Sequence, residues 1–367
     1  MFKIQLRVNN IRLSIYSLKV EEMVKILITG GTGFIGIPLV KKLNSLGHTL
    51  KLLIRENSNI TPFKNLNNIE YIIGDVQDID SLYKTIKDID LIYHLAGYVK
   101  TWAKDKAIYY NINIQGAENI AKIALENNVP LMYMSSFGAL GPNPVNSTEA
   151  TNENFQHVDF FINEYEKTKF LGREKIKEYI EKGLKSVIFY PGFVYGPGDF
   201  NLYGEMVFDI VAGQFLGLPG KGESVFCMCY LDDVINGMGN VIGRDDLYGQ
   251  GFVLGGENIK IGEYLDLIAE IAGVKNPRRF PKWLGMFYAR LSKSKTIFSK
   301  KRVPYITPDM IIGMDYNWAY SSDSAIEKLG YKLTPIREGL TKTVKWYKDF
   351  INANGKKKKK IGIRVIK

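Results

Sequence analysis

The chain has 367 residues, of which 46% are hydrophobic, and a formal net charge of +11. This length can bury the core of one large α/β domain or two smaller ones, and the composition excludes a disordered or fibrous protein. No apolar run approaches the ~20 residues that a bilayer-spanning helix needs.

The positive charge is concentrated at the two ends of the chain. Residues 356–367 carry seven positive charges and no negative one, residues 1–22 carry a net +2, and the rest is left with +2. This nearly balanced body predicts no nucleic-acid partner. We expect the basic tail (351–367) to be disordered and solvated, with a weak membrane-surface contact as the alternative.

Residues 1–22 form a basic extension with no clear signal-peptide core or cleavage site. Because Met23 directly precedes the first strand, we expect an upstream, mis-assigned start, and an organelle-targeting segment is the alternative. Cys227 and Cys229 are too close together for a structural bridge and lack other metal ligands nearby in sequence. They indicate two small strand residues, no metal site, a reducing compartment and hence a cytoplasmic location.

The first unit of the chain reads as strand, glycine-rich turn and helix. An apolar strand is predicted at Val24–Thr29, and a helix at Pro38–Leu46. Between them, Gly30 permits a tight turn, Gly33 lets a pyrophosphate approach the backbone, and Gly36 lets the helix pack close to the strand. The helix N-terminus offers N–H groups to phosphates, so the sequence predicts dinucleotide binding.

Strand-like runs then alternate with helical patterns, which is the signature of a parallel sheet covered on both faces. The predicted strands are at 49–55, 69–73, 91–95, 131–135, 186–190 and 252–254. Helices are predicted at 79–87, 107–127, 163–182, 206–212, 232–242, 261–272, 322–329 and 336–350. The predicted fold is an α/β, Rossmann-type doubly wound sheet over 23–190, followed by a smaller substrate-binding lobe over 191–350 with interleaved core elements.

Tyr165 and Lys169 lie four residues apart on a predicted helix, and therefore on one face. A free tyrosine has a pKa of about 10, which a nearby ammonium group and a cationic nicotinamide would lower. Ser136 follows a strand, at the edge where ligands bind such sheets, and can donate a hydrogen bond to a substrate oxygen. Asn113, on the preceding long helix, can hold an ordered water. The alternatives are a solvated helix face, a helix cap and a helical asparagine without function.

The chain resembles the extended short-chain dehydrogenase/reductases of the NAD-dependent epimerase/dehydratase kind, over about residues 23–350. The resemblance depends on an ordered series of motifs: TGGTGFIG (29–36), GDV (74–76), YHLAG (93–97), NINIQGAEN (111–119), YMSSFGALG (133–141), YEKTK (165–169), YPGFVYGPGD (190–199), YLDDV (230–234) and a C-terminal SSDSAIEKLGY…TPIREGL…WY (321–347). It implies that Ser136, Tyr165 and Lys169 are a catalytic triad with Asn113 as helper, and that His94 is a strand residue and not a base.

The resemblance also implies a set of cofactor-binding residues. The pyrophosphate would be held by Gly30, Gly33, Phe34, Ile35 and Gly36. The adenine and its ribose would meet Asp75, Val76, Leu95, Ala96 and Gly97. The nicotinamide side would meet Tyr165, Lys169, Pro191, Gly192 and Val194. Arg55 stands at the end of the second strand, where an acidic residue would select NAD, so we expect NADP, with NAD as the alternative.

Within the family the chain is similar to the dihydroflavonol-reductase-like branch, which includes plant farnesol dehydrogenases and hopanoid-associated putative sugar epimerases. Nucleotide-sugar epimerases typically place an arginine just before the motif that here reads YLDD, whereas residues 221–229 contain none. Aromatic residues expected in the pocket are Tyr98, Trp102, Phe137, Phe161, Phe193 and Tyr203, and ordinary core packing is the alternative for them. Together these features favour an apolar substrate. The segment 283–291 is expected to be a packed helix, with a pocket cap or a membrane contact as alternatives.

We therefore predict an NAD(P)-dependent oxidoreductase that transfers hydride between nicotinamide and an apolar alcohol or carbonyl compound, with Tyr165 as acid/base. The first alternative is a nucleotide-sugar epimerase or dehydratase whose tightly held NAD is regenerated in each cycle. The second is a redox-sensing or scaffold protein that has lost the reaction. A homodimer through the two long helices is the expectation that the family provides.

Overall fold

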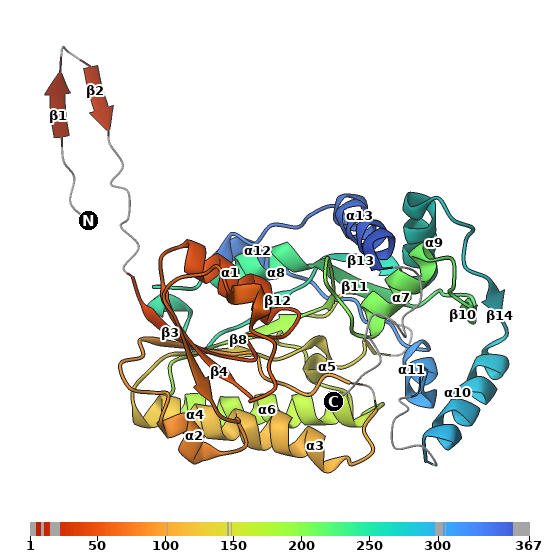
Figure 1. Ribbon diagram of the computed structural model, residues 1–367, viewed down its shortest axis with the longest axis horizontal. Coiled ribbons are helices and arrows are strands. Elements are labelled where there is room, and N and C mark those ends of the chain that lie inside the picture. Colours follow the sequence, from red (N-terminus) through yellow and green to blue (C-terminus); the bar gives the residue numbers. More distant parts are fainter. Residues whose placement is uncertain are drawn as a thin grey trace.

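The computed structural model describes residues 5–8, 11–14, 23–100, 102–144, 147, 149–297, 304 and 306–354 (Figure 1). Within the N-terminal extension, β1 (Gln5–Val8) and β2 (Ile11–Ser14) pair as an antiparallel hairpin. The other expectations for residues 1–22, and those for residues 355–367, lie outside the described residues. The expected disordered tail is wrong for residues 351–354, which are the last turn of α13 (Ile336–Asn354), where Ile351 is buried.

A seven-stranded sheet forms the centre of the fold, in the order β12-β8-β7-β6-β3-β4-β5. All six neighbouring pairs are parallel. The strands are β3 (Lys25–Thr29), β4 (Thr49–Ile54), β5 (Ile69–Ile73), β6 (Leu91–His94), β7 (Leu131–Met134), β8 (Ser186–Pro191) and β12 (Gly251–Leu254). The four central strands are apolar runs with almost every residue buried, as a sheet covered on both faces requires. The predicted Rossmann-type sheet is confirmed.

Helices cover both faces of this sheet (Figure 1). One face carries α1 (Gly36–Ser45), α8 (Leu231–Gly239) and α12 (Asp323–Leu329). The other carries α2 (Ile79–Tyr83), α4 (Gly116–Glu126) and α6 (Glu164–Glu181). Two separate apolar clusters result, one on each side of the sheet.

The predicted helix 107–127 is continuous but not uniform. It begins as α3 (Ala107–Tyr110), passes through one π-helical segment, η2 (Asn111–Gln115), and continues as α4. A π-helical turn holds an extra residue and is frequent at functional sites. Asn113 lies in this widened turn and is buried.

The second half of the chain builds a smaller lobe and also returns to the large sheet. A three-stranded mixed sheet has the order β13 (Glu257–Lys260), β11 (Val225–Tyr230), β9 (Phe193–Tyr195). Between β11 and β13 the chain contributes β12 to the edge of the large sheet, beside β8. The helices of this lobe are α7 (Leu202–Val211), α9 (Ile261–Ala272) and α13 (Ile336–Asn354).

A peripheral layer follows at the far end of this lobe (Figure 1). Its elements are β10 (Leu218–Pro219), which pairs in parallel with β14 (Arg279–Phe280), and the helices α10 (Lys282–Ile297) and α11 (Pro308–Gly313). The remaining short helices are α5 (Phe137–Leu140), η1 (Thr61–Phe63) and η3 (Asp245–Leu247). Among the described residues, no helix combines the length and apolarity that crossing a membrane requires.

Cys227 and Cys229 lie on β11, and both are buried and free, so the prediction of two small strand residues is confirmed. Burial raises the pKa of the Cys227 thiol to about 11.

The glycine turn after β3 depends on contacts that no side chain could share. Gly30 has a φ of +73°, and a Cβ there would lie 2.6 Å from Ala96 N. A Cβ on Gly36 would lie 2.2 Å from Gly30 O, whereas one on Gly33 would meet only that same oxygen, at 3.2 Å. The expected role of Gly36 in close helix packing is therefore confirmed.

We expect Gly36→Ala to lower the free energy of unfolding by at least ~1–3 kcal/mol, because backbone must move to admit the methyl group. Gly313→Ala is the matched control, since its Cβ would meet nothing closer than 4.0 Å. Urea unfolding measures both variants. A Gly36→Ala protein as stable as Gly313→Ala would contradict the packing described here.

Candidate active site

The carboxyl ends of the parallel strands bring the predicted site residues to one edge of the sheet. The strand order reverses between β3 and β6, which is where ligands bind in such sheets. There Leu95 N donates to Thr29 O at 3.0 Å, and Ala96 N approaches Thr29 Oγ1 at 3.4 Å. The glycine turn after β3 and the segment 95–97 after β6 are thus in direct contact.

The start of α1 is suited to an anionic group. Ile35 is its N-cap residue and makes no side-chain cap hydrogen bond, so no side-chain oxygen caps the first-turn N–H groups. Phe34 and Ile35 are part-buried and lie between Gly33 and this helix end. Ile37 N donates to Gly33 O at 2.9 Å and Pro38 has no N–H, so it is the positive end of the helix dipole beside a turn kept narrow by glycine that fits the diphosphate of a dinucleotide.

Two other predicted cofactor segments flank this turn. After β5, Asp75 Oδ1 accepts hydrogen bonds from Gln77 N at 2.9 Å and Gln77 Nε2 at 3.1 Å, while Val76 is buried. After β8, Pro191 and Gly192 lead into β9, which contains Val194; a Cβ on Gly192 would lie 2.5 Å from Cys227 O. Segments 75–77 and 191–194 are thus held by hydrogen bonds and backbone packing within the chain.

Arg55 directly follows β4 and is exposed. Burial and, secondly, the charge of Arg55 lower the pKa of Lys100, which follows β6. The two side chains therefore place positive charge at neighbouring points of the same sheet edge. No motif or spacing selects Lys100 in the sequence, because it lies 45 residues from Arg55 and belongs to no motif.

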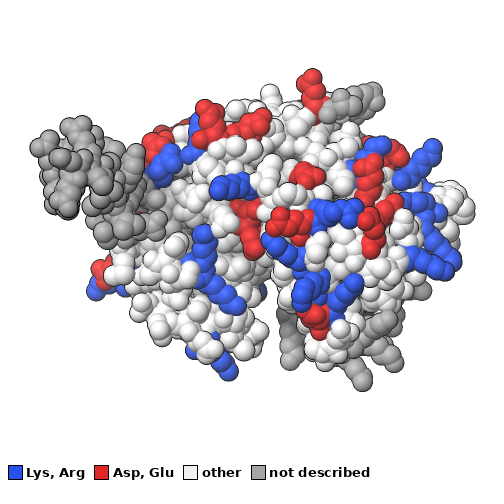
Figure 2. Space-filling model, turned by 90° about the horizontal axis from the view of Figure 1, so that it is seen from above, with Lys and Arg blue, Asp and Glu red and all other residues white. Residues whose placement is uncertain are grey.

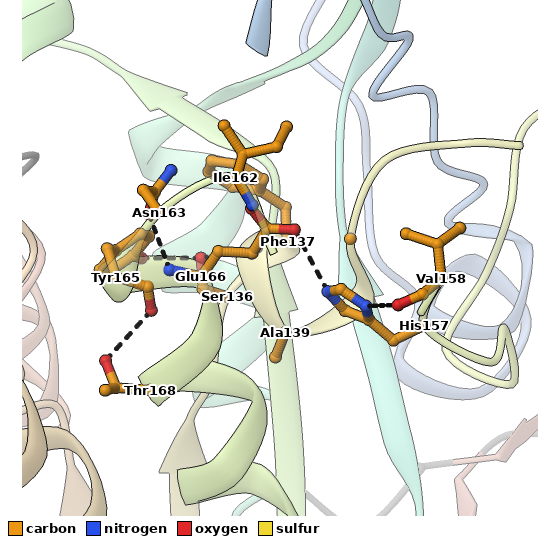
Figure 3. Close-up of polar contacts among 12 residues, drawn as sticks. Ser136, Phe137, Ala139, His157, Val158, Ile162, Asn163, Tyr165, Glu166 and Thr168 are labelled. Carbon is orange, nitrogen blue, oxygen red and sulfur yellow. Dashed lines mark hydrogen bonds and ion pairs between the residues drawn. The ribbon is translucent and has the colours of Figure 1, made fainter. Parts of the chain in front are cut away.

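Tyr165 and Ser136 form the centre of the site (Figure 3). Tyr165 lies in the first turn of α6, which Asn163 caps by accepting a hydrogen bond from Glu166 N at 2.9 Å. Its Oη donates to Ser136 Oγ at 2.8 Å. Ser136 is also the N-cap residue of α5 and accepts from Gly138 N at 3.1 Å, so the cap alternative is confirmed, and its hydrogen bond to a substrate oxygen stays a prediction.

Lys169 lies one turn after Tyr165, and its ammonium group is buried against the end of β7. Its Nζ donates to Met134 O at 2.9 Å and lies 5.3 Å from the centroid of the Tyr133 ring. Burial lowers the pKa of Lys169 to about 7.

The predicted lowering of the tyrosine pKa by this lysine together with a cationic nicotinamide stays a prediction, and burial acts against it. Burial raises the pKa of Tyr165 to about 12, and the hydrogen bond with Ser136 acts in the opposite direction with a smaller effect. The lysine directs its Nζ to Met134 O. Tyr165 is therefore a protonated phenol at neutral pH.

Asn113 links two parts of the site by direct hydrogen bonds, and its expected role of holding an ordered water stays a prediction. Its Oδ1 accepts from Tyr98 N at 2.7 Å, and its Nδ2 donates to Tyr98 O at 3.1 Å and to Thr168 Oγ1 at 3.0 Å. The amide thus fastens the loop after β6 to α6.

His94 is a strand residue, as predicted. It lies buried on β6, with Nδ1 at 2.8 Å from Thr29 Oγ1 and its ring parallel to that of Tyr133. Burial and then the charge of Lys169 lower its pKa to about 3. It is therefore neutral at physiological pH.

The predicted aromatic residues fall into separate groups. The rings of Phe137 and Phe193 lie 3.9 Å apart by their centroids. Three more rings pack around them. Tyr203 was predicted to lie in the pocket, whereas Phe226 and Trp318 were not. We call these five residues the aromatic cluster. Tyr98 and Trp102 lie together in the loop after β6, where Tyr98 Oη donates to Trp102 O at 3.3 Å.

Phe161 does not join the aromatic cluster, contrary to expectation. It packs against His157 and Phe170, with centroid distances of 4.6 and 5.3 Å, and lines a cavity of about 800 Å³ between α6 and the edge of the sheet formed by β8 and β12. His157 Nε2 lies 3.2 Å from Glu166 Oε1, and Glu166 Oε2 accepts a hydrogen bond from Ile162 N at 2.9 Å (Figure 3). This buried pair lies beside the loop leading to Tyr165, which the bond from Ile162 N fastens to α6. Sequence reasoning missed it, because its members are nine residues apart and only one is in a motif.

Comparison with known proteins agrees with a site for a dinucleotide cofactor. The model of the "NAD dependent epimerase/dehydratase family" matches residues 26–255. A putative dihydroflavonol 4-reductase from Synechocystis is 26% identical over 88% of this chain and 94% of its own length. Sterol demethylase protein B from Methylococcus capsulatus is 26% identical over 88% of this chain and 98% of its own.

Among solved structures, gox2253 superimposes with a TM-score of 0.75 and 28% identity, covering 89% of this chain and 98% of its own. A UDP-glucose 4-epimerase from Thermotoga maritima superimposes with a TM-score of 0.72 at 22% identity, over 89% of this chain and 99% of its own. The second likeness concerns the fold alone.

We expect the buried neutral state of His94 to make stability depend on pH. The unfolded histidine binds a proton near its ordinary pKa of 6.5, whereas the folded one does so only near about 3. Stability from this group is therefore complete above pH 6.5 and falls as the pH drops towards 3, with a slope of up to about 1.4 kcal/mol per pH unit.

His94→Asn retains a polar partner for Thr29 and removes this titration. The pH dependence of the free energy of unfolding between pH 6.5 and 4 should be shallower in the variant, as urea unfolding measures. Parallel curves for the two proteins would contradict a neutral buried His94.

Proposed function

Because the chain belongs to the NAD-dependent epimerase/dehydratase family, we propose that it is an NAD(P)-dependent oxidoreductase of an apolar alcohol or carbonyl compound. The observation that carries this proposal is the hydrogen bond of 2.8 Å between Tyr165 Oη and Ser136 Oγ, one helical turn from a buried lysine. A protein that only binds a nucleotide has no need of this arrangement.

The residues at the sheet edge suit a dinucleotide. Gly33, whose Cβ would meet only Gly30 O, leaves room for the diphosphate at the start of α1, where Gly30 and Gly36 keep the turn narrow, and segments 75–76, 95–97 and 191–194 flank that turn. The cofactor, when bound, supplies or accepts the hydride.

The chain's own residues handle the proton and the substrate oxygen. Tyr165, a protonated phenol with its pKa raised to about 12, acts as the acid that protonates the oxygen of a carbonyl substrate. Ser136 orients the phenol and donates a hydrogen bond to the same oxygen. Lys169 supplies positive charge beside the site when it is protonated.

An apolar substrate is supported by three features. The aromatic cluster follows directly from Ser136 through Phe137 and from β8 through Phe193. Residues 221–229, before the YLDD motif, contain no arginine to hold a substrate diphosphate. Several relatives have names that refer to dihydroflavonol, sterols or hydroxysteroids. We propose a place in the dihydroflavonol-reductase-like branch. The epimerase or dehydratase alternative lacks the corresponding phosphate ligand.

The cofactor preference and the assembly are also proposals. The positive charges of Arg55 and Lys100 at the end of β4 and after β6 support NADP, whose 2′-phosphate they can pair with. A homodimer would use α4 and α6, which pack side by side on one face of the sheet.

We expect Tyr165→Phe to lower kcat by ~10²–10⁴-fold, because general acid catalysis contributes this much. The phenyl ring keeps the contact with Gly138, so cofactor affinity should stay within a factor of two or three. Tyr179→Phe, later on the same helix, is the matched control with unchanged kcat. The decisive readout is the initial rate of NAD(P)H oxidation with an apolar carbonyl substrate. Full activity of Tyr165→Phe would refute the mechanism.

We expect Arg55→Ala to weaken NADPH binding at least tenfold while leaving NADH binding nearly unchanged, since only NADPH carries the extra phosphate. Lys100→Met should act in the same direction, and Lys104→Ala, an exposed lysine of the same loop, should have no effect. Fluorescence titration with both cofactors compares them. Equal losses for NADPH and NADH in Arg55→Ala would contradict the assignment.

A further inference from the structure

Helix α10 buries small residues and exposes large apolar ones, which is the reverse of an ordinary amphipathic helix. Its buried positions hold small residues, Gly285 and Ala289. A Cβ on Gly285 would lie 2.7 Å from Pro219 Cβ and 3.1 Å from Ile311 Cδ1. The helix therefore approaches β10 and α11 closely with its narrow face, and its large residues are left on the other side.

The outward face of α10 is made of large apolar side chains. Trp283 is 70% exposed and Phe287 is 57% exposed. The residues of this face, which we call the α10 face, are Trp283, Leu284, Phe287, Tyr288 and Leu291. Their spacing of three and four residues makes them neighbours on the helix surface. The expectation of a simply packed helix at 283–291 is thus wrong for its large residues, and a contiguous apolar patch of this kind marks an interaction site.

The chain around α10 is strongly basic. Between Ile271 and Pro308 it has ten Lys and Arg residues and no Asp or Glu. Of the described basic side chains, Lys282 is paired with Asp315, and Arg279 with Asp266. Seen from above, the outermost charged side chains at this end of the molecule are Lys and Arg (Figure 2).

We propose that the α10 face binds an anionic membrane surface, with the helix lying in the interface. Exposed Trp, Phe and Leu flanked by Lys and Arg are the features of interfacial helices, and Trp and Tyr favour the headgroup level. The acid-free basic segment supplies charge complementarity to anionic lipids. The same charge disfavours a second copy of the chain as the occupant, because two such faces would repel each other.

This surface is connected to the site by α11. Ile311 of α11 contacts α10 at Gly285, and Gly313, at its end, accepts a hydrogen bond from Trp318 Nε1 at 2.9 Å. Trp318 belongs to the aromatic cluster. If the proposed function holds, membrane binding places the substrate lobe beside the lipid phase in which an apolar substrate accumulates.

The test is co-sedimentation of the full chain with vesicles of phosphatidylcholine containing 30% phosphatidylserine, and with vesicles of phosphatidylcholine alone. We expect binding to the anionic vesicles, weakened by salt. The double variant Trp283→Asp with Phe287→Asp should lower the partition coefficient at least tenfold. Ile326→Asp, an exposed apolar residue of α12 that is 43% exposed, is the matched control and should bind as the unaltered chain does.

Three further measurements make the result decisive. Circular dichroism confirms folding of each variant, and Trp283→Ala provides a milder substitution with an expected intermediate loss. Changing Lys356 to Lys360 to Gln tests the tail separately, and binding should persist. Loss of all binding in this tail variant, or none lost in the double Asp variant, would overturn the proposal. So would dimerisation through the α10 face without vesicle binding. Because vesicle binding needs no nucleotide, failure of the proposed oxidoreductase activity would leave this result unaffected.

Discussion

The close backbone contact among Gly30, Gly36 and Ala96 is the constraint on which the rest of the structure depends. It fixes α1 on the end of β3 and brings the end of β6 alongside. With the strands parallel, this contact sets one edge at which Ser136 and Tyr165 meet. The fold thereby separates two tasks: backbone at the glycine turn is shaped for a diphosphate, and side chains further along the edge are arranged for proton transfer.

The large sheet could be predicted from the sequence because its strands are uniformly apolar and alternate with amphipathic helices. The meeting of Ser136 and Tyr165 was predictable from motifs. The short strands β10 and β14 could not be predicted, because a strand of two residues is too short to show the alternation of apolar and polar residues. The hydrogen bonds of Asn113 depend on the π-helical turn, and the contact between His157 and Glu166 depends on the path of a loop. Hydrophobic periodicity predicts neither feature. The Tyr165 pKa depends on burial, which only coordinates give.

The active site and the far end of the substrate lobe place charged and apolar groups in opposite environments. In the active site, burial raises the pKa of Tyr165 and lowers the pKa of Lys169 to about 7. A charged ligand bound there would therefore change the pKa of both groups. At the far end of the substrate lobe, α10 exposes aromatic residues amid basic ones. The proposed apolar substrate would connect these two features, because apolar compounds partition into membranes and pack against aromatic side chains.

The most direct test of the central claim is cofactor exchange. The purified full chain is analysed for co-purified nucleotide, equilibrated with radiolabelled NADPH or NADH, and then challenged with excess unlabelled cofactor. A dehydrogenase or reductase that uses its cofactor as a cosubstrate predicts micromolar or tighter binding with complete exchange within minutes. A stoichiometric NAD that co-purifies and does not exchange would contradict the account and indicate internal redox chemistry. Binding of neither cofactor would contradict it altogether.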